Sequence, residues 1–552
     1  MPSRILQINS NDLFAKLLKF STLEKKVSLK VLALKNFLKV HIIERARLLL
    51  VKASRSVSKK KIAQASSKKR KFLFNTQYIH AFSELEFISA AQLKLKGHDV
   101  VVIICDGLPY SEREIIDLPD IKSYKSCSDR TKRFCNAFGI DYIYLSSFLD
   151  NQERIRAHAL SQKNISVIQD YEQNGINIGE YAKRNHAHYF KGDIKPEGSY
   201  EPIYRKAFEA ALLVECAMTK ILQQYQDYDL VTANGKFIQS GIPIELAKNL
   251  GNSFYTYEHF RQGNCIILDK DRCALEQNMD AVWNQIKSVA LNDDDLEKLY
   301  HSFDLQQKSI SLEDNLWDEN RIDDEDQIIS LLGIDASKKI VACYPNVYWD
   351  SVHMGMKAVS KDLTHWLADM IEFAKAHKNI QLIIRTHPAE SKVPHLIQSK
   401  FTMADSLYGM FKSMPSNVII IEPTSDISSY SLARIADANL LWNGTLGLEF
   451  ILRGIKPTVV ADAYYANKGF TDDFLSFDDL EHYLLGLTTK PAINSDEQIL
   501  AERFCYHVRF KRKFSPPFYR GTVSYFHNYF DLYPGKNETI DNIVGFFLGE
   551  NT

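Results

Sequence analysis

The stretch Ala438–Gly469 reads ANLLWNGTLGLEFILRGIKPTVVADAYYANKG and decides the fold. An apolar run over 438–442 stops at Asn443, a helical pattern follows over 446–453, and a second apolar run covers 458–461. This pattern predicts a strand, a tight turn, a helix and a second strand, the repeating unit of a parallel α/β sheet. The turn then lies at the carboxyl end of a strand and opens a helix.

The predicted turn has residues that suit an anion. Gly444 and Gly447 are small, so backbone N–H groups at the helix start can approach a phosphate closely. Asn443 and Thr445 complete this turn, and Glu449 lies in the first two helical turns, within reach of a ribose hydroxyl. A helix start of this kind is common in α/β proteins whatever they bind, so alone it is evenly balanced between ligand binding and packing.

A second segment, QLIIRTHPAE over 381–390, favours ligand binding. It reads as a buried strand ending in Arg385 and His387, and Pro388 biases the histidine before it toward an extended conformation. We expect both side chains to face the same crevice as the turn at 443–449. The alternative is a strand end with a surface arginine and a capping histidine.

These segments, with the loop Asn346–Asp350, resemble bacterial capsule and surface polysaccharide biosynthesis proteins. Some of those are sugar transferases similar to Kdo transferases and sialyltransferases of the GT-B architecture. The resemblance is ordered over 345–471 and implies a nucleotide-sugar co-substrate, with no cofactor and no metal. It implies nucleotide or phosphate contacts from Arg385, His387, Glu390, Ser428, Ser429, Asn443, Gly444, Thr445, Gly447 and Glu449, and substrate contacts from Asn346, Trp349, Asp350 and His259.

Two strand-end acids are candidates for the base that deprotonates an acceptor hydroxyl. Glu258 follows the apolar run 254–257, and Asp106 follows another predicted strand. Kdo transferases and sialyltransferases tend to show an acidic pair followed by glycine, whereas Tyr257–Phe260 reads YEHF, with one acid and no glycine. For either acid, a role as loop anchor or helix cap is as well supported as catalysis.

Length and composition predict a globular protein of two main domains. The 552 residues exceed what one hydrophobic core supports, and 45% hydrophobic with 25% charged residues excludes a disordered chain. The eight cysteines are scattered without a CxxC pair, which indicates reduced thiols in a cytoplasmic protein. His186-Ala187-His188 has the spacing of two metal ligands on a strand, but no third ligand is evident, so we expect ordinary histidines.

A net charge of +0 conceals a strong asymmetry. Residues 1–71 hold 19 Lys or Arg against three acids, so this arm carries +16 and the remainder −16. Its apolar residues recur at helical spacing, but no run is long enough to span a membrane. Basic amphipathic helices bind anionic lipid surfaces, so we expect a peripheral protein on the inner face of the cytoplasmic membrane, with no nucleic-acid partner. The alternative is an arm that packs on the acidic body.

Short strands alternating with helices predict α/β folding into two doubly wound Rossmann-like domains that face each other across a cleft. The predicted parts are a basic amphipathic arm at 1–71, an acceptor-side domain at 72–268, an acidic linker region at 269–335, a nucleotide-sugar domain at 336–490, and an aromatic and basic tail at 491–552 that packs back on the body.

The predicted function is transfer of a sugar from a nucleotide-activated donor to a surface or capsular polysaccharide, with inversion and without a metal. Breaking the donor bond builds negative charge on the departing phosphate, which fixed hydrogen-bond donors stabilise. Two alternatives remain open: a CDP-polyol phosphotransferase of the teichoic acid type, and a non-catalytic glycan-assembly component with the same fold.

Overall fold

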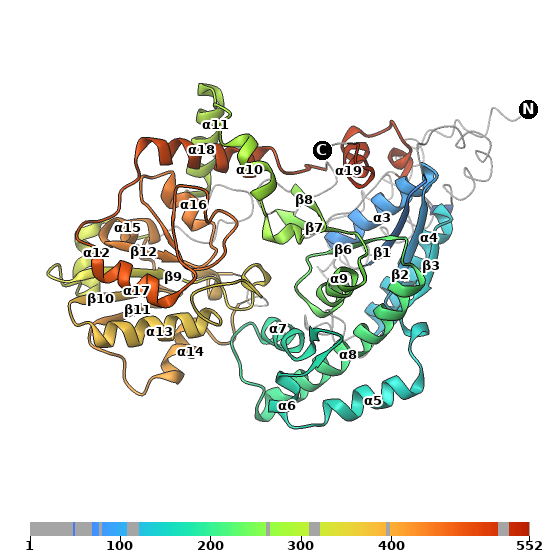
Figure 1. The fold of residues 1–552 in the computed structure, drawn as a ribbon, viewed down its shortest axis with the longest axis horizontal. Helices are drawn as coiled ribbons and strands as arrows, with labels where there is room; N and C mark the ends of the chain where they lie inside the picture. Colours follow the sequence, from blue (N-terminus) through green and yellow to red (C-terminus); the bar gives the residue numbers. More distant parts are fainter. Residues whose placement is uncertain are drawn as a thin grey trace, which may run out of the picture.

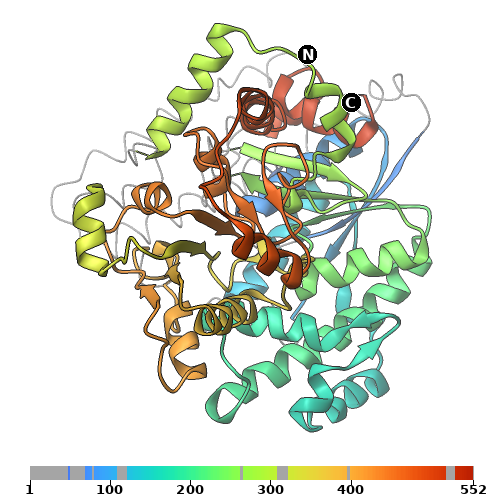
Figure 2. The same ribbon diagram turned by 60° about the vertical axis from the view of Figure 1, so that its left-hand side comes forward.

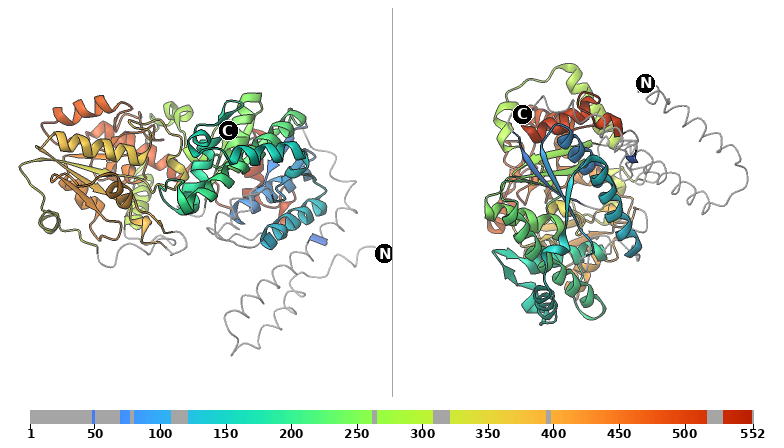
Figure 3. Two further views of the ribbon diagram at one scale, coloured as in Figure 1. Left: turned by 90° about the horizontal axis from the view of Figure 1, so that it is seen from below. Right: turned by 90° about the vertical axis from the view of Figure 1, so that its right-hand side faces the viewer.

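The structure is a computed structural model that describes residues 48–49, 69–76, 80–107, 121–260, 265–307, 321–393, 398–516 and 529–550. Nearly all of the arm predicted over 1–71 lies outside these residues, so its membrane contact stays a prediction. Two lobes lie side by side, the first coloured blue to green and the second yellow to orange (Figure 1; Figure 3, left). Each lobe contains one six-stranded sheet, which confirms the predicted pair of Rossmann-like domains.

The first sheet has the strand order β3-β2-β1-β6-β7-β8, and only its edge pair β7–β8 is antiparallel. Counted along the chain this is the order 3-2-1-4-5-6 of Rossmann-like sheets. The strands are β1 (Lys71–Asn75), β2 (Asp99–Ile104), β3 (Asp141–Tyr144), β6 (Asp229–Ala233), β7 (Phe254–Phe260) and β8 (Cys265–Lys270), with a small hairpin of β4 (Glu172–Gln173) and β5 (Ile176–Asn177) outside the sheet.

Helices cover both faces of this sheet (Figure 3, right). Phe72 and Phe74 belong to one apolar cluster and Leu73 to another, because successive side chains of a strand point to opposite faces. Both faces are therefore buried, as is usual for parallel strands. The helices of this part are α3 (His80–Leu95), α4 (Ile121–Phe138), α5 (Asn151–Ser161), α6 (Ile165–Gln169), α7 (Ile178–Phe190), α8 (Glu201–Gln224) and α9 (Ile238–Leu250).

The second sheet is parallel throughout, in the order β11-β10-β9-β12-β13-β14, again 3-2-1-4-5-6 along the chain. Its strands are β9 (Lys339–Tyr344), β10 (Ile380–Arg385), β11 (Val418–Ile421), β12 (Ala438–Leu441), β13 (Thr458–Val459) and β14 (Asp472–Asp473). Its helices are α13 (Leu363–Ala376), α14 (Met403–Met410), α15 (Ser429–Ile435), α16 (Leu446–Ile451) and α17 (Phe477–Gly486).

The described part of the acidic region predicted as a linker over 269–335 packs on the second lobe from α10 onward, whereas its first residues belong to β8 and to a short turn beside the first sheet. Helices α10 (Asp280–Ile286) and α11 (Asp293–Gln307) share an apolar cluster with α16, through Trp283 and Leu299. Helix α12 (Glu325–Leu332) places Ile328 in the core beneath the second sheet. The acids cap or flank these helices, while the apolar positions between them supply the burial.

The tail returns to the first lobe. Helix α18 (Ser495–Phe510) lies on the second lobe, and Phe514 then forms two backbone hydrogen bonds of 2.8 Å with Ile266 in β8. Helix α19 (Glu538–Leu548, red) lies beside α3 of the first lobe (Figures 1 and 2). Its Phe547 is fully buried against Phe72. The first domain therefore takes part of its core from the far end of the chain.

The end of the basic arm is engaged with the body. Arg70 donates to Asp229 at 2.5 Å and to the Phe547 carbonyl at 2.6 Å. Its neighbours form ion pairs with further acids near the start of the sheet: Lys69 with Asp99, and Lys71 with Asp227. These three cations are not free to bind a lipid surface. Among the described residues, no helix combines the length and apolar character that crossing a bilayer requires.

Candidate functional site

In each sheet the strand order reverses between the first and fourth strands, β1 and β6 or β9 and β12. Ligands of doubly wound sheets bind beyond the carboxyl ends of the strands at such a reversal. In the second domain these ends carry the loop 345–354 and the turn 442–445. The two segments touch there, because the Asn443 backbone N–H donates to Asn346 Oδ1 at 3.2 Å.

The carboxyl ends of the two sheets meet at Asn234. This residue directly follows β6 and adopts a left-handed backbone with φ of 56°, which asparagine tolerates well. Its Nδ2 donates to Glu258 Oε2 at 2.8 Å and to Ser351 Oγ, in the loop of the second domain, at 3.1 Å. One amide therefore joins an acid of the first domain to the loop at the reversal of the second sheet.

Glu258 lies near the end of β7 and is 8% exposed. Its Oε1 accepts the backbone N–H of His259 at 2.8 Å, while Oε2 faces Asn234. The structure thus places the carboxylate at the contact between the domains, one hydrogen bond away from the amide that reaches Ser351. His259 follows it in the same strand and is partly exposed.

Asp106 has a different setting. Its Oδ1 accepts the Ser146 backbone N–H at 3.0 Å, and its Oδ2 accepts the Ser146 hydroxyl. It follows β2, which is separated from β7 by β1 and β6, or about 14 Å at the usual strand spacing. The structure does not bring the two candidate bases together, and Asp106 anchors the loop after β3.

Arg385 is directed into its own domain. It is 3% exposed and donates to the carbonyls of Thr386, Glu422 and Ser425 at 3.2, 2.9 and 3.0 Å. Burial lowers the pKa of this guanidinium to about 10. The side chain holds the segment after β11 in place through its two terminal nitrogens, whereas its buried Nε has no hydrogen-bond partner among the described residues.

The neighbouring residues of this segment also serve local structure. His387 Nδ1 accepts the Ala389 N–H at 3.0 Å, which caps the short turn at 388–390. Glu390 Oε1 accepts the Met403 N–H at 3.0 Å at the start of α14, and within the described residues its Oε2 has no hydrogen-bond partner. Burial raises the pKa of Glu390 to about 8, so the carboxyl is mostly protonated at neutral pH.

The turn before α16 is less open than its two glycines suggest. A Cβ on Gly447 would lie 2.5 Å from the Tyr465 hydroxyl, whereas a Cβ on Gly444 would find nothing closer than 3.9 Å. The Tyr465 hydroxyl donates to the Gly444 carbonyl at 2.9 Å. Gly447 is therefore needed for packing against Tyr465, and Gly444 is the glycine whose surroundings leave space.

Glu449 and the serines before it are engaged in packing. The Tyr430 hydroxyl donates to Glu449 Oε2, and Thr445 Oγ1 approaches Oε1 at 3.4 Å. Burial raises the pKa of Glu449. Ser428 caps α15 by accepting the Ser431 N–H at 3.4 Å, whereas Ser429 is partly exposed. The structure does not direct the Glu449 carboxylate toward an exposed ligand.

Trp349 and Asp350 lie in the loop that meets the first domain. The Trp349 indole N–H donates to Ser399 Oγ at 3.1 Å, and its carbonyl faces His188 Nδ1 at 3.4 Å. Asp350 caps the turn at 351–353 by accepting the Val352 N–H at 3.2 Å. Both residues are therefore positioned beside the domain contact made by Ser351.

His186 and His188, whose spacing would suit two metal ligands on a strand, both belong to the helix α7. Helical spacing turns them apart: His186 Nε2 lies 3.1 Å from the Tyr200 carbonyl, whereas His188 faces Trp349. Within the described part of the chain, no group of three His, Cys, Asp or Glu side chains is arranged to hold a metal ion.

Asn234 and Ser351 were not among the predicted site residues. Asn234 directly follows the apolar run of β6 and precedes Gly235, and Asn-Gly is a sequence typical of a turn at a strand end. The sequence therefore contained a signal for a turn at Asn234. It contained no signal for the contact with Ser351, because no local pattern shows which loops of two domains will meet.

No family model matches this chain, and no curated protein matches it. Solved structures with some likeness include the Thermosulfurimonas dismutans KpsC beta Kdo 2,7 transferase, with 13% identity, 60% of this chain and 89% of that chain covered, and a TM-score of 0.31. The spinosyn rhamnosyltransferase SpnG has 10% identity, 80% and 95% coverage, and a TM-score of 0.24. A putative UDP-N-acetylglucosamine 2-epimerase from Listeria monocytogenes has 8% identity, 80% and 94% coverage, and a TM-score of 0.24.

These structures include Kdo transferases. At such identities and TM-scores the likeness says nothing about activity, so function must be inferred from this chain's own residues.

Proposed function

We propose that this chain is a glycosyltransferase that moves a sugar from a nucleotide-activated donor to a glycan acceptor. The observation that carries the proposal is the meeting of the two sheets at Asn234, which joins Glu258 of one domain to Ser351 of the other. Each side of this contact is a sheet reversal, where doubly wound domains bind ligands. Two ligands bound at these facing edges would have their reactive groups close together.

Glu258 is the proposed base. A carboxylate held by the Asn234 amide and the His259 backbone N–H keeps a fixed direction while it takes a proton from an acceptor hydroxyl. The transfer then forms a bond from the acceptor oxygen to the donor sugar and breaks the bond to the departing phosphate, with inversion at the sugar carbon. In this proposal no metal takes part.

The second domain offers the donor-side contacts. Asn443 is 4% exposed, and its Oδ1 has no hydrogen-bond partner among the described residues. A buried amide oxygen without a donor is costly, and a ligand hydroxyl or N–H would satisfy it. The open position at Gly444 lies beside it, so the nucleotide is proposed to bind over this turn.

The decisive experiment combines donor turnover with two matched acid variants. The chain is incubated with CMP-, CDP-, UDP- and GDP-activated donors, and nucleotide release is followed with and without acceptor glycan. Glu258→Gln should lower kcat about a hundredfold or more, the usual scale for losing a general base, and leave nucleotide affinity unchanged. Asp106→Asn, at the structural anchor, should lower it far less.

Three outcomes would contradict the proposal in different ways. Transfer of labelled phosphate into the polymer would identify a polyol phosphotransferase. Nucleotide binding without turnover of any donor would identify a non-catalytic assembly component. Full activity of Glu258→Gln would remove the assignment of the base.

The capsular acceptor and a peripheral position on an anionic membrane surface are part of the same proposal. The support for the membrane position is the charge of +16 on residues 1–71, of which Lys69, Arg70 and Lys71 form ion pairs with the body. Deleting residues 2–60 should abolish salt-sensitive binding to vesicles containing phosphatidylserine, since such attraction is screened over about 8 Å at physiological ionic strength. Unchanged vesicle binding would refute this part.

A further inference from the structure

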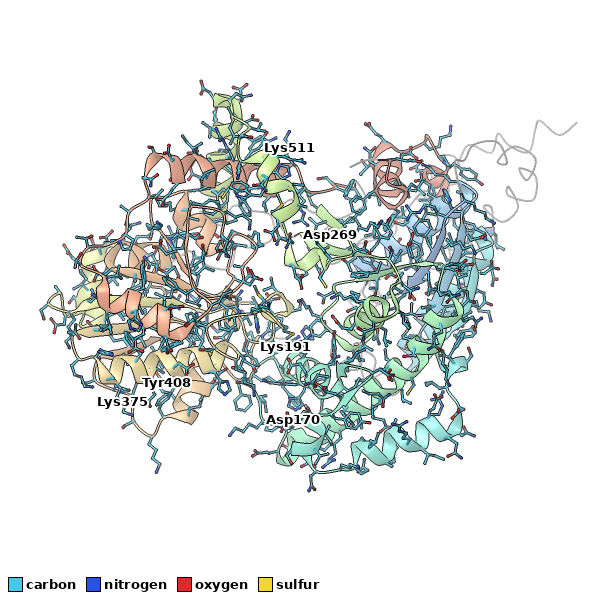
Figure 4. All side chains as sticks on the ribbon, viewed as in Figure 1. Asp170, Lys191, Asp269, Lys375, Tyr408 and Lys511 are labelled. Atoms are coloured by element: carbon cyan, nitrogen blue, oxygen red, sulfur yellow. The ribbon has the colours of Figure 1, made fainter. Side chains whose placement is uncertain are left out.

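Lys191 lies between the two lobes (Figure 4). It ends helix α7 of the first domain in a left-handed conformation with φ of 53°, and its carbonyl accepts the Lys400 N–H of the second domain at 3.1 Å. The residue is 8% exposed. A lysine this buried is unusual unless its charge is compensated.

The surroundings of the Lys191 ammonium provide an aromatic ring and a histidine, but no ion pair with a carboxylate in the described part of the chain. Its Nζ lies 3.1 Å from His188 Nε2 and 4.3 Å from the centre of the Trp349 ring. Because His188 Nδ1 faces a carbonyl, which only accepts, the proton resides on Nδ1 and Nε2 accepts from the lysine. Burial lowers the pKa of His188 to about 3, so the ring is neutral.

Lys191 forms no ion pair with a carboxylate in the described part of the chain, and His188 is its one hydrogen-bond acceptor there. The charged groups around it are Lys400, which opposes its charge, and Asp350, which favours it. Burial, then Lys400, lowers the pKa of Lys191 to about 8. Since an ammonium has three donors, two are left for a partner that the protein itself does not supply.

The position of this ammonium connects it to the donor side of the site. Trp349, on which it rests, belongs to the loop after β9, and Ser351 of the same loop accepts from Asn234, which also donates to Glu258. Trp349 and Ser351 are two positions apart in this loop, which turns at 347–353. Lys191 and Glu258 therefore approach the same loop from the first domain at neighbouring points.

We propose that Lys191 is a phosphate-binding residue, contributed by the first domain, whose ammonium binds the phosphate oxygens of the activated-sugar donor against the Trp349 ring. A phosphate supplies the negative charge and the acceptors that the site lacks. The ring of Trp349 stabilises the cation and keeps it directed at the ligand. This inference rests on the proposed function for the identity of the donor, but phosphate binding itself is independent of turnover.

The test is calorimetric titration of the full chain with inorganic pyrophosphate. Lys191→Met should weaken binding tenfold or more, while Lys191→Arg, which keeps the charge, should weaken it less than threefold. The matched control is Lys375→Met, on the outer side of the second lobe (Figure 4) and 57% exposed, which should bind as the unchanged chain does. Equal affinity of the unchanged chain and Lys191→Met, or no pyrophosphate binding at all, would overturn the proposal.

A second measurement serves if Lys191→Met does not fold. An anion beside an ammonium raises its pKa, so binding near pH 8 to the unchanged chain should take up protons, visible as a dependence of the heat on the buffer. The uptake should be smaller in Lys191→Arg, whose guanidinium is always charged. Equal uptake in both would overturn the proposal, as would Lys191-dependent binding of glucuronate, a carboxylate, without binding of pyrophosphate. Pyrophosphate binding without donor turnover would instead refute the proposed function alone.

Discussion

The carboxyl ends of β7 and β10 look alike in sequence and differ in the structure. Each strand carries a buried charged residue at or near its carboxyl end, Arg385 as the last residue of β10 and Glu258 two residues before the end of β7. Glu258 faces Asn234 and the other domain, whereas Arg385 bonds to three carbonyls of its own domain. A charged residue near a strand end can serve either the fold or a ligand. Its hydrogen-bond partners in the structure distinguish these two roles, and the sequence alone does not.

The largest effect is expected at Arg385. Arg385→Met keeps the length of the side chain but removes its hydrogen bonds to the carbonyls of Thr386, Glu422 and Ser425. The Glu422 carbonyl still accepts the Ser425 N–H, and the Ser425 carbonyl still accepts Lys392 Nζ. At about 1.5 to 3 kcal/mol for each hydrogen bond from a charged group, the free energy of unfolding should fall by about 3 kcal/mol or more. Urea unfolding measures this, with Arg434→Met as a control whose exposed ion pair with Glu325 should matter by less than about 0.5 kcal/mol.

The same experiment also tests the prediction from sequence that Arg385 binds the donor phosphate. If Arg385→Met unfolds at the same urea concentration as the unchanged chain and loses turnover a hundredfold, then Arg385 acts on the phosphate after all. The difference between the two strand ends would then disappear.

A smaller effect is expected at Glu390, and it depends on pH. Its pKa is raised to about 8 in the folded chain, above its value of about 4.3 when unfolded, so the folded state holds the extra proton between these values. The contribution to stability is therefore complete below about pH 4 and is lost as the pH rises through 8. Glu390→Gln keeps the acceptor for the Met403 N–H without a titrating group, so it should be more stable than the unchanged chain at pH 9 and similar at pH 5.

Urea unfolding at pH 5, 7 and 9 checks this sign. A parallel pH dependence in the chain and in Glu390→Gln would show that the carboxyl is not the source. Such a result would also imply that ionising Glu390 does not lower the stability of the folded chain, as expected for an exposed carboxylate that binds a ligand.

The smallest effect separates the two glycines of the turn before α16. Gly447→Ala must push Tyr465 aside, at a cost typical of overpacking, about 1 to 3 kcal/mol. Gly444→Ala meets nothing closer than 3.9 Å and should unfold as the unchanged chain does. Thermal unfolding of both variants measures the difference. If Gly447→Ala were stable but unable to bind nucleotide, the predicted anion site at this glycine would be supported.

The architecture could be predicted from the sequence because strands and helices follow local patterns of apolar residues. The apolar run that begins the segment 381–390 forms β10, and the strand, turn, helix and strand predicted over 438–461 are present as β12, α16 and β13. The partners of the site residues were not predictable in this way. Arg385, Gly447 and Glu449 meet groups that are distant in sequence, and whether such a side chain turns inward depends on packing that periodicity does not encode.

Asp106 and Glu258 illustrate the same limit within one domain. The sequence places both acids after apolar strands, whereas the structure puts Glu258 inside β7 and Asp106 after β2. The strand order separates the two acids, and Asp106 is engaged by Ser146. Strand order arises from long-range pairing, which a single sequence does not show. The contact of Asn234 with Ser351, which gives Glu258 its significance, depends on the relative position of two whole domains.

Helix α19 has a consequence for how the protein is made. Phe547, Val544 and Ile543 fill the same apolar cluster as Phe72 and Phe74, although more than 450 residues separate them in the sequence. Domains generally fold as units, amino-terminal first, during synthesis. The first domain lacks part of its apolar core until α19 has been synthesised. Because the second domain is synthesised before α19, we expect an apolar surface of the first domain to stay exposed during that time.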